Sequence, residues 1–205
     1  MSKEWVRQRK RDHYYKRAKA EGYRSRAAFK LKEINNRVRI IKPGHRVLDV
    51  GAAPGGWSQV AREIAGDKGL VVAVDMVPMP SIEGVKFIQG DIESDDTLDR
   101  ILGISDRYDA VISDAAPKLS GNRVLDRGRA FSLCWAVLKM SKSVLRPGGN
   151  VLLKMFQGDE VDELKDEYLE YFHEMDVFKP KSSLKRSYEI FLLFRNFRSV
   201  RTNDL

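Results

Sequence analysis

The stretch DVGAAPGGW at residues 49–57 decides the fold class of this 205-residue chain. It joins a predicted strand at 45–50 (HRVLDV) to a predicted helix at 56–66. In open α/β sheets such a turn faces a ligand that lies beyond the carboxyl ends of the strands, and glycines let the backbone approach that ligand closely. A glycine-rich turn can also be only a tight turn, so the surrounding pattern has to decide.

Beyond this turn, predicted strands and helices alternate along the chain. The strands are predicted at 45–50, 70–75, 85–89, 109–113, 149–154, 174–179 and 187–194. The helices are predicted at 56–66, 94–103, 126–145 and 159–172. Alternation of this kind implies right-handed crossovers and a parallel sheet covered by helices on both faces. No helix fits between the last two strands, so we predict a Rossmann-like, mostly parallel seven-stranded sheet with one reversed strand.

Basic residues are concentrated in the N-terminal part of the chain. Residues 1–42 contain 15 Lys and Arg against four Asp and Glu, whereas 43–205 contain 22 against 25. A basic arm on a nearly neutral body favours a polyanionic partner. We therefore predict a single domain, 1–205, in which 1–42 is a basic, helical, RNA-binding extension and 43–205 is the catalytic body.

Within this extension, residues 25–38 are predicted to form a helix that docks on the body. Its apolar stripe is formed by Ala27, Leu31, Ile34 and Val38. On helical geometry a cationic flank lies beside this stripe, formed by Arg26, Lys30 and Arg37. Phe29 is predicted to lie on the outer face. Aromatic side chains that can stack on bases are interleaved with the charges, namely Trp5, Tyr14, Tyr15, Tyr23 and Phe29.

The composition excludes several classes of protein. No apolar run approaches the roughly 18 residues that span a bilayer, and the N-terminus has no signal-peptide apolar region. One cysteine, Cys134, cannot form an internal disulfide framework or a cysteine metal cage. The three histidines are scattered along the chain. We expect a cytoplasmic protein without a metal ion, which acts as a monomer and away from membranes.

Acidic residues stand where three further strands end. Asp75 ends the second predicted strand, Asp91 follows the third and Asp114 follows the fourth. Each could be a helix cap or a loop residue alone, but together with the glycine turn they indicate a nucleoside cofactor. Acids at these ends suit a cationic sulfonium better than a pyrophosphate, and the glycines do not have the G-x-G-x-x-G spacing. S-adenosylmethionine is therefore favoured over NAD.

At this point the sequence resembles the FtsJ family of ribosomal RNA ribose 2′-O-methyltransferases over nearly its whole length. The resemblance rests on SRAAFKL at 25–31, DVGAAPGGWSQ at 49–59, SDAAP at 113–117, Leu153-Lys154, and RSYE at 186–189. It implies a catalytic tetrad formed by Lys30, Asp114, Lys154 and Glu189, with Lys154 as the proton acceptor. It also implies cofactor contacts from Gly55, Trp57, Asp75, Asp91 and Asp114.

The resemblance further implies methyl transfer from S-adenosylmethionine to a ribose 2′-hydroxyl, and a uridine of large-subunit ribosomal RNA is the target expected for a chain without added domains. Topology supports part of the tetrad independently. Asp114 and Lys154 end parallel strands at one edge, and Glu189 lies near the start of the reversed strand. Lys30 has no such independent support, since it would otherwise be a surface lysine.

Several alternatives remain open from the sequence. The target could be a transfer RNA or a cap ribose, or the chain could be a non-catalytic RNA-binding factor of ribosome assembly. An amino-group methyltransferase is disfavoured because Asp114-Ala-Ala-Pro117 replaces the Asn/Asp-Pro-Pro-Tyr segment of enzymes that act on adenine. A pyrimidine C5 enzyme needs a cysteine nucleophile, and Cys134 is better explained as a buried thiol in a helix.

Overall fold

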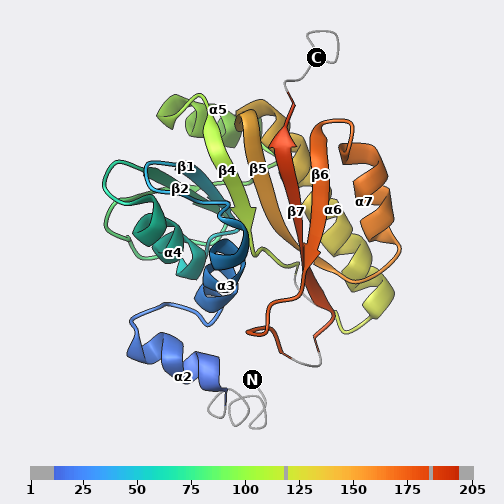
Figure 1. The fold of residues 1–205 in the computed structure, drawn as a ribbon, viewed down its shortest axis with the longest axis horizontal. Coiled ribbons are helices and arrows are strands. Elements are labelled where there is room, and N and C mark those ends of the chain that lie inside the picture. Colours follow the sequence, from blue (N-terminus) through green and yellow to red (C-terminus); the bar gives the residue numbers. More distant parts are fainter. Residues whose placement is uncertain (1–11, 118–119, 185–186, 199–205) are drawn as a thin grey trace.

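The structure, a computed structural model, describes residues 12–117, 120–184 and 187–198. Its centre is one seven-stranded sheet with the strand order β3-β2-β1-β4-β5-β7-β6 (Figure 1). The strands are β1 Arg46–Val50, β2 Leu70–Asp75, β3 Val85–Gln89, β4 Tyr108–Ser113, β5 Leu145–Phe156, β6 Phe172–Phe178 and β7 Glu189–Phe197. The predicted mostly parallel, doubly wound sheet is thereby confirmed.

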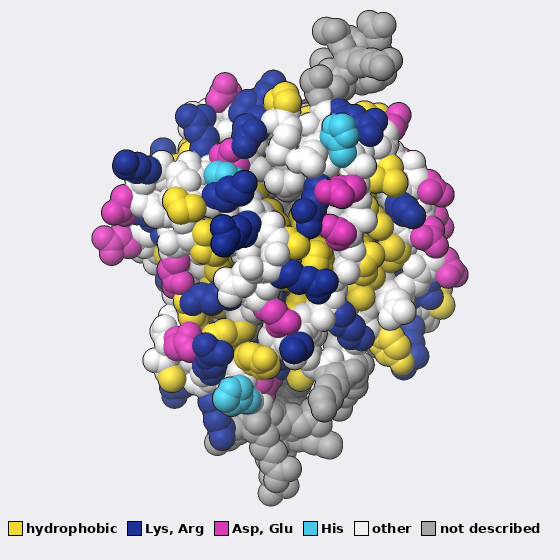
Figure 2. Space-filling model, in the orientation of Figure 1, with side chains coloured by type: hydrophobic (Ala, Val, Ile, Leu, Met, Phe, Trp, Pro, Cys, Tyr) yellow, Lys and Arg dark blue, Asp and Glu magenta, His cyan; other side chains and the backbone are white. Residues whose placement is uncertain are grey.

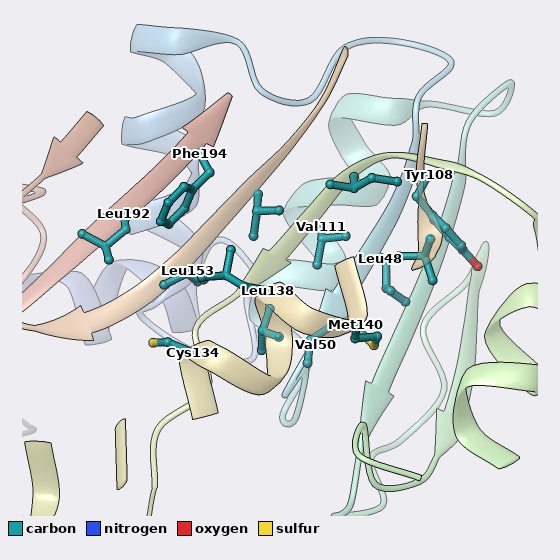
Figure 3. Close-up of a cluster of buried hydrophobic side chains, with 14 of the residues drawn as sticks. Leu48, Val50, Tyr108, Val111, Cys134, Leu138, Met140, Leu153, Leu192 and Phe194 are labelled. Carbon is teal, nitrogen blue, oxygen red and sulfur yellow. The ribbon is translucent and has the colours of Figure 1, made fainter. Parts of the chain in front are cut away.

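Helices cover both faces of this sheet. They are α2 His13–Ala20, α3 Ala28–Val38, α4 Gly56–Ala65, α5 Asp95–Ile104, α6 Arg123–Val144 and α7 Glu160–Tyr168. Buried side chains of α5, α6 and α7 form one apolar cluster with the sheet, and those of α2, α3 and α4 form another on the opposite face. In the first cluster, Leu138 and Met140 of α6 pack against strand residues such as Leu48 and Val111 (Figure 3). No helix of the described residues is long and apolar enough to cross a membrane.

The reversed strand is β7, which lies between β5 and β6 and runs antiparallel to both. In this register Lys154 faces Phe191 and Phe156 faces Glu189, so Lys154 and Glu189 are diagonal neighbours on adjacent strands. The predicted proximity of these two residues is confirmed.

The predicted helix at 159–172 is too long at its carboxyl end. Helix α7 ends at Tyr168, and Phe172 begins β6. The reason is packing, because the fully buried Phe172 is paired across the strands with Phe197 and its ring lies 5.3 Å from that ring, centroid to centroid. A helical conformation through Phe172 would remove this pair from the core.

The predicted outer position of Phe29 is wrong. Phe29 is only 5% exposed, because α2 folds over α3 and places Tyr14 5.6 Å from the Phe29 ring, centroid to centroid. The Arg17 guanidinium lies 4.5 Å from the centre of the same ring. Tyr23 is buried in this cluster too, so neither it nor Phe29 presents a free ring to RNA. Trp5 lies outside the described residues.

The 25–38 helix does not present the cationic flank that was predicted for it. Lys30 is turned inward and is 7% exposed. Arg26 donates hydrogen bonds to the Asp12 carboxylate and to the carbonyl of Ser182. Charged surface remains nearby, since Lys16 and Lys19 of α2 are exposed. In Figure 2 several Asp and Glu side chains lie along the edge formed by α7 and others lie elsewhere on the face, while Lys and Arg are spread over the whole face, including the side of α2 and α3.

Candidate active site at the carboxyl edge of the sheet

The glycine-rich turn lies between β1 and α4 and fits closely against the loop that follows β4. Gly51 has φ +68°, and a Cβ there would lie 2.4 Å from the Cβ of Ala115. Gly55 has φ +105°, and a Cβ there would lie 2.7 Å from Ile82 Cδ1. Both positions therefore require glycine for conformation and for space. The turn leaves backbone N–H groups at the start of α4 without partners inside the helix, which is the usual setting for ligand contacts.

Asp75 connects the end of β2 to this turn. Its Oδ2 accepts the Ala53 N–H at 2.8 Å and its Oδ1 accepts the Val77 N–H at 2.7 Å. Each carboxylate oxygen keeps a second lone pair, so Asp75 can still accept hydrogen bonds from ribose hydroxyls. The next residues, Met76 and Val77, are 68% and 60% exposed and offer an apolar surface beside it. Asp91 follows β3, is exposed, and accepts the Glu93 N–H.

Asp49 at the end of β1 was quoted in the motif but received no role from the sequence. It is 1% exposed, its Oδ2 accepts the Ser58 hydroxyl at 2.5 Å, and its Oδ1 has no partner among the described residues. Burial raises the pKa of Asp49 to about 7, and the nearby Asp114 and Asp75 charges add to this, although the Ser58 hydrogen bond opposes it. An acid inside the otherwise apolar strand was the signal that could have identified it.

Trp57 takes a different place from the other predicted cofactor residues. Its side chain is 3% exposed, and its Nε1 donates to the Ala27 carbonyl at 2.8 Å. The ring stacks on Phe191 at 5.6 Å between centroids, which fixes α4 against α3 and the sheet. The indole thus serves packing, and the predicted cofactor contact of Trp57 would fall to its backbone N–H in the first turn of α4.

The four predicted tetrad residues converge at the carboxyl edge of β4 and β5 in an alternating ring of charges. Lys30 Nζ lies 3.6 Å from Asp114 Oδ1 and 3.3 Å from Glu189 Oε1. Lys154 Nζ lies 3.1 Å from Asp114 Oδ1 and 3.8 Å from Glu189 Oε1. It also donates to the Asp114 backbone carbonyl at 2.6 Å. Helix α3, two parallel strands and the reversed strand each contribute to this ring.

Charge balance explains how this ring can be buried. The side chains of Lys30 and Lys154 are 8% and 9% exposed, and those of Asp114 and Glu189 are 17% and 19% exposed. Removing such charges from water is costly unless each has partners of opposite sign. Burial alone would raise the pKa of Glu189, but Lys30 and Lys154 outweigh it and hold that pKa below its usual value. Glu189 is therefore a carboxylate at neutral pH.

Ser187 holds Glu189 in position and was missed as a functional residue. Its Oγ donates to Glu189 Oε2 at 2.9 Å and accepts the Glu189 N–H at 3.1 Å. The sequence signal that could have identified Ser187 was its place in the RSYE segment, two residues before Glu189. Arg186 of that segment lies outside the described residues.

Cys134 is buried in α6, with its Sγ 3.1 Å from the Lys154 carbonyl, and burial raises the pKa of its thiol to about 12. It is thus unsuited to be a nucleophile. Among the described residues no group of three or more His, Cys, Asp or Glu side chains is placed to hold a metal ion.

Comparison with known proteins identifies the family. Residues 23–197 match the family described as FtsJ-like methyltransferase. The chain belongs to this family. This FtsJ-like methyltransferase is 47% identical to "Ribosomal RNA large subunit methyltransferase E" of Methanothermobacter thermautotrophicus, over 97% of this chain and 95% of the relative. It is also 47% identical to the protein of the same name from Pseudomonas aeruginosa, over 96% of both chains.

Solved structures agree with the fold of the FtsJ-like methyltransferase. A Plasmodium falciparum protein described as a ribosomal RNA methyltransferase superposes with a TM-score of 0.79 at 31% identity, covering 87% of this chain and all of that chain. Aeropyrum pernix fibrillarin, crystallised with natively bound S-adenosyl-L-methionine, superposes with a TM-score of 0.57 at 17% identity, covering 84% of this chain and 75% of that chain. At that identity the second likeness concerns the fold.

Proposed function

We propose that this chain transfers a methyl group from S-adenosylmethionine to the ribose 2′-hydroxyl of a uridine in large-subunit ribosomal RNA. The observation that carries the proposal is the alternating ring of Lys30, Asp114, Lys154 and Glu189 beside the glycine-rich turn. Large-subunit ribosomal RNA as the substrate comes from the names of relatives that are 47% identical over almost the whole chain. The uridine and its 2′-hydroxyl come from the resemblance to the FtsJ family of ribose methyltransferases.

The carboxyl ends of β1, β2 and β3 fit a cationic nucleoside cofactor. Asp75 would accept hydrogen bonds from its ribose hydroxyls, and Met76 with Val77 would cover an adenine face. Asp49, Asp75 and Asp91 form no ion pair with a described Lys or Arg, which suits a positively charged ligand and opposes a pyrophosphate. When bound, S-adenosylmethionine supplies a methyl group that its sulfonium already activates.

Lys154 has the geometry to orient the reacting 2′-oxygen. Its Nζ lies 3.1 Å from Asp114 Oδ1 and donates to the Asp114 carbonyl, and it can donate a further hydrogen bond to the hydroxyl. To accept the hydroxyl proton, an ammonium at Lys154 must first release one of its own protons to water, because the lowered pKa of Glu189 makes that carboxylate a poor recipient. We propose that Lys154 orients the oxygen and takes up its proton.

The basic extension at 1–42 also contributes to this proposed site through α3. Lys30 completes the charged ring, and α3 shares one apolar cluster with the sheet. We propose that 1–205 is one methyltransferase domain, with the boundary near residue 42 separating a basic surface from the body. We also propose that it acts as a monomer in the cytoplasm, on ribosomal subunits.

One experiment tests the proposed function directly. Large ribosomal subunits from a cell that lacks this protein are incubated with it and labelled S-adenosylmethionine, and the modified nucleotide is then mapped. One ribose-methylated uridine in the large-subunit RNA is expected. Label in an amino group, in a base carbon or in no RNA would overturn the proposal. If calorimetry detects no S-adenosylmethionine binding, a non-catalytic assembly factor replaces it.

A further inference from the structure

A cavity lies beside the charged ring and has no role in the chemistry described so far. Its volume is about 350 Å³, within the usual range of about 300–1,000 Å³ for small-molecule sites. It lies between the start of α6, the end of β5 and the residues before β7. Its lining includes Arg123, Arg127, Phe156, Gln157, Ser187 and Tyr188.

The cavity presents an aromatic ring and a cation at its surface. Tyr188 is 53% exposed although it is a large aromatic residue, and the Arg123 guanidinium lies 4.7 Å from the centre of its ring. The Gln157 N–H donates to the Tyr188 carbonyl at 2.9 Å, which fixes the backbone of Tyr188. Arg127 is held by Glu160, with 2.5 Å between Nη2 and Oε2. Tyr188 and Arg123 are both exposed and line the cavity, so a flat ligand there can reach the aromatic ring and the guanidinium.

One residue connects the cavity to the charged ring. Ser187 lines the cavity, and its Oγ donates to Glu189 Oε2 at 2.9 Å. A ribose whose 2′-oxygen lies at Lys154 and Glu189 carries its base on the carbon next to the one that bears this oxygen. The base must therefore lie only a few bonds from the charged ring. The cavity begins one side chain away from Glu189, where this base would be.

We propose that this cavity binds the base of the nucleotide whose ribose is methylated, an inference that rests on the proposed function. The base stacks on Tyr188 and meets the Arg123 guanidinium, since aromatic rings and guanidinium planes are the usual stacking partners of unpaired bases. The Gln157 amide supplies both a donor and an acceptor for a base edge. Tyr188, Arg123 and Gln157 are thus substrate-positioning residues.

The first test separates stacking from stability. Loss of a stacking contact weakens binding about 5- to 150-fold, so Tyr188→Ala should raise the subunit concentration for half-maximal single-turnover methylation by that factor. S-adenosylmethionine affinity and thermal stability should not change. Tyr188→Phe should stay within about twofold of wild type, because it keeps the ring. Val177→Ala is a matched control, because Val177 is 52% exposed but lies on β6. A wild-type concentration dependence for Tyr188→Ala would overturn the proposal.

The second test identifies the nucleotide. A photo-crosslinking p-benzoyl-phenylalanine is placed at position 188, with the same residue at position 177 as control, and crosslinks to the subunit RNA are mapped. A crosslink from position 188 to the nucleotide that becomes methylated supports the proposal. A crosslink only to other nucleotides, or none while the wild-type protein methylates, overturns it. Failure of the wild-type protein to methylate the subunit would instead overturn the proposed function.

Discussion

The carboxylates in the two halves of the sheet's carboxyl edge differ in whether lysines compensate their charge. At the ends of β1, β2 and β3, the carboxylates of Asp49, Asp75 and Asp91 are held by hydroxyl and backbone N–H groups, and no described Lys or Arg forms an ion pair with them. At β4, β5 and β7, two carboxylates alternate with two lysines at 3.1–3.8 Å.

This difference indicates which kind of ligand each half can bind. Uncompensated carboxylates are stabilised by a ligand that brings positive charge, as a sulfonium cofactor does. A balanced ring needs no charge from its ligand and can instead orient a neutral hydroxyl and move a proton. The comparison therefore predicts that substitutions in one half change cofactor binding or ionisation, whereas substitutions in the other change the chemical step.

The largest effect is expected for Lys154→Ala in the balanced half. Loss of the proposed proton acceptor should lower single-turnover methylation by about 10²- to 10⁴-fold, the usual contribution of a general base. S-adenosylmethionine and RNA affinities should change little. Lys165→Ala, on the exposed face of α7, is the matched control.

Lys154→Arg distinguishes proton transfer from orientation. Arginine keeps the positive charge between Asp114 and Glu189 but cannot lose its proton at working pH. A rate close to that of Lys154→Ala supports proton acceptance by Lys154. A near-normal rate for the arginine variant would leave Lys154 only an electrostatic role, and a near-normal rate for the alanine variant would refute the tetrad.

Asp49→Asn tests the uncompensated half through the pH dependence of stability. The Asp49 pKa is about 7 in the folded protein and close to 4 in the unfolded chain, so the folded state binds the proton more tightly. Its stabilising contribution is present below about pH 4 and is lost as the pH rises to 7. Between pH 5 and 8 the wild-type unfolding free energy should fall by on the order of 3 kcal/mol relative to that of Asp49→Asn.

Denaturant unfolding of both proteins at several pH values measures this difference, so that other titrating groups cancel. Asp95→Asn is the control, because Asp95 is exposed in the first turn of α5. Parallel pH profiles for wild type and Asp49→Asn would mean that Asp49 is ionised throughout and that a neighbouring group compensates it.

Asp75→Ala should have a smaller effect, confined to the cofactor. Hydrogen bonds to a charged group contribute about 1.5–3 kcal/mol, and part of this holds the turn at Ala53 rather than the ligand. Calorimetry should show S-adenosylmethionine affinity reduced about tenfold, with RNA affinity unchanged. Glu189→Gln, in the other half of the edge, should leave cofactor affinity within about twofold. Equal losses of S-adenosylmethionine affinity in the two variants would mean that the two halves do not differ in cofactor binding.

Sequence periodicity predicted the strands and their crossovers well, because β1 to β5 are apolar runs and helical segments separate all of them except β2 and β3. The resemblance supplied Lys30, which periodicity alone would have left on the surface. The errors came from contacts between segments that are separated in the sequence and meet only in the folded chain. Phe29 was misplaced because α2 covers it, and the roles of Asp49 and Ser187 depend on partners that only the folded chain brings near.

The smallest predicted effect concerns charges outside both halves. In Figure 1, β4 points toward the side on which α2 lies, so the exposed Lys16 and Lys19 of α2 are on the side of the carboxyl edge. Each lysine that contacts a phosphate of single-stranded RNA adds about 0.7 to the slope of log affinity against log salt. Lys16→Gln combined with Lys19→Gln should therefore flatten this slope by about 1.4 and leave cofactor affinity unchanged.

Removing all of residues 1–20 would be a poorer test, because it also removes Tyr14 and Arg17 from the Phe29 ring and would expose that ring. The double substitution keeps α2 folded, since neither lysine forms an ion pair with a described side chain. Lys68→Gln with Lys86→Gln removes the same charge from exposed positions in the body, near the start of β2 and on the edge strand β3, and should leave the slope unchanged. If both pairs flatten it equally, RNA responds to net charge alone and α2 has no special part in binding it.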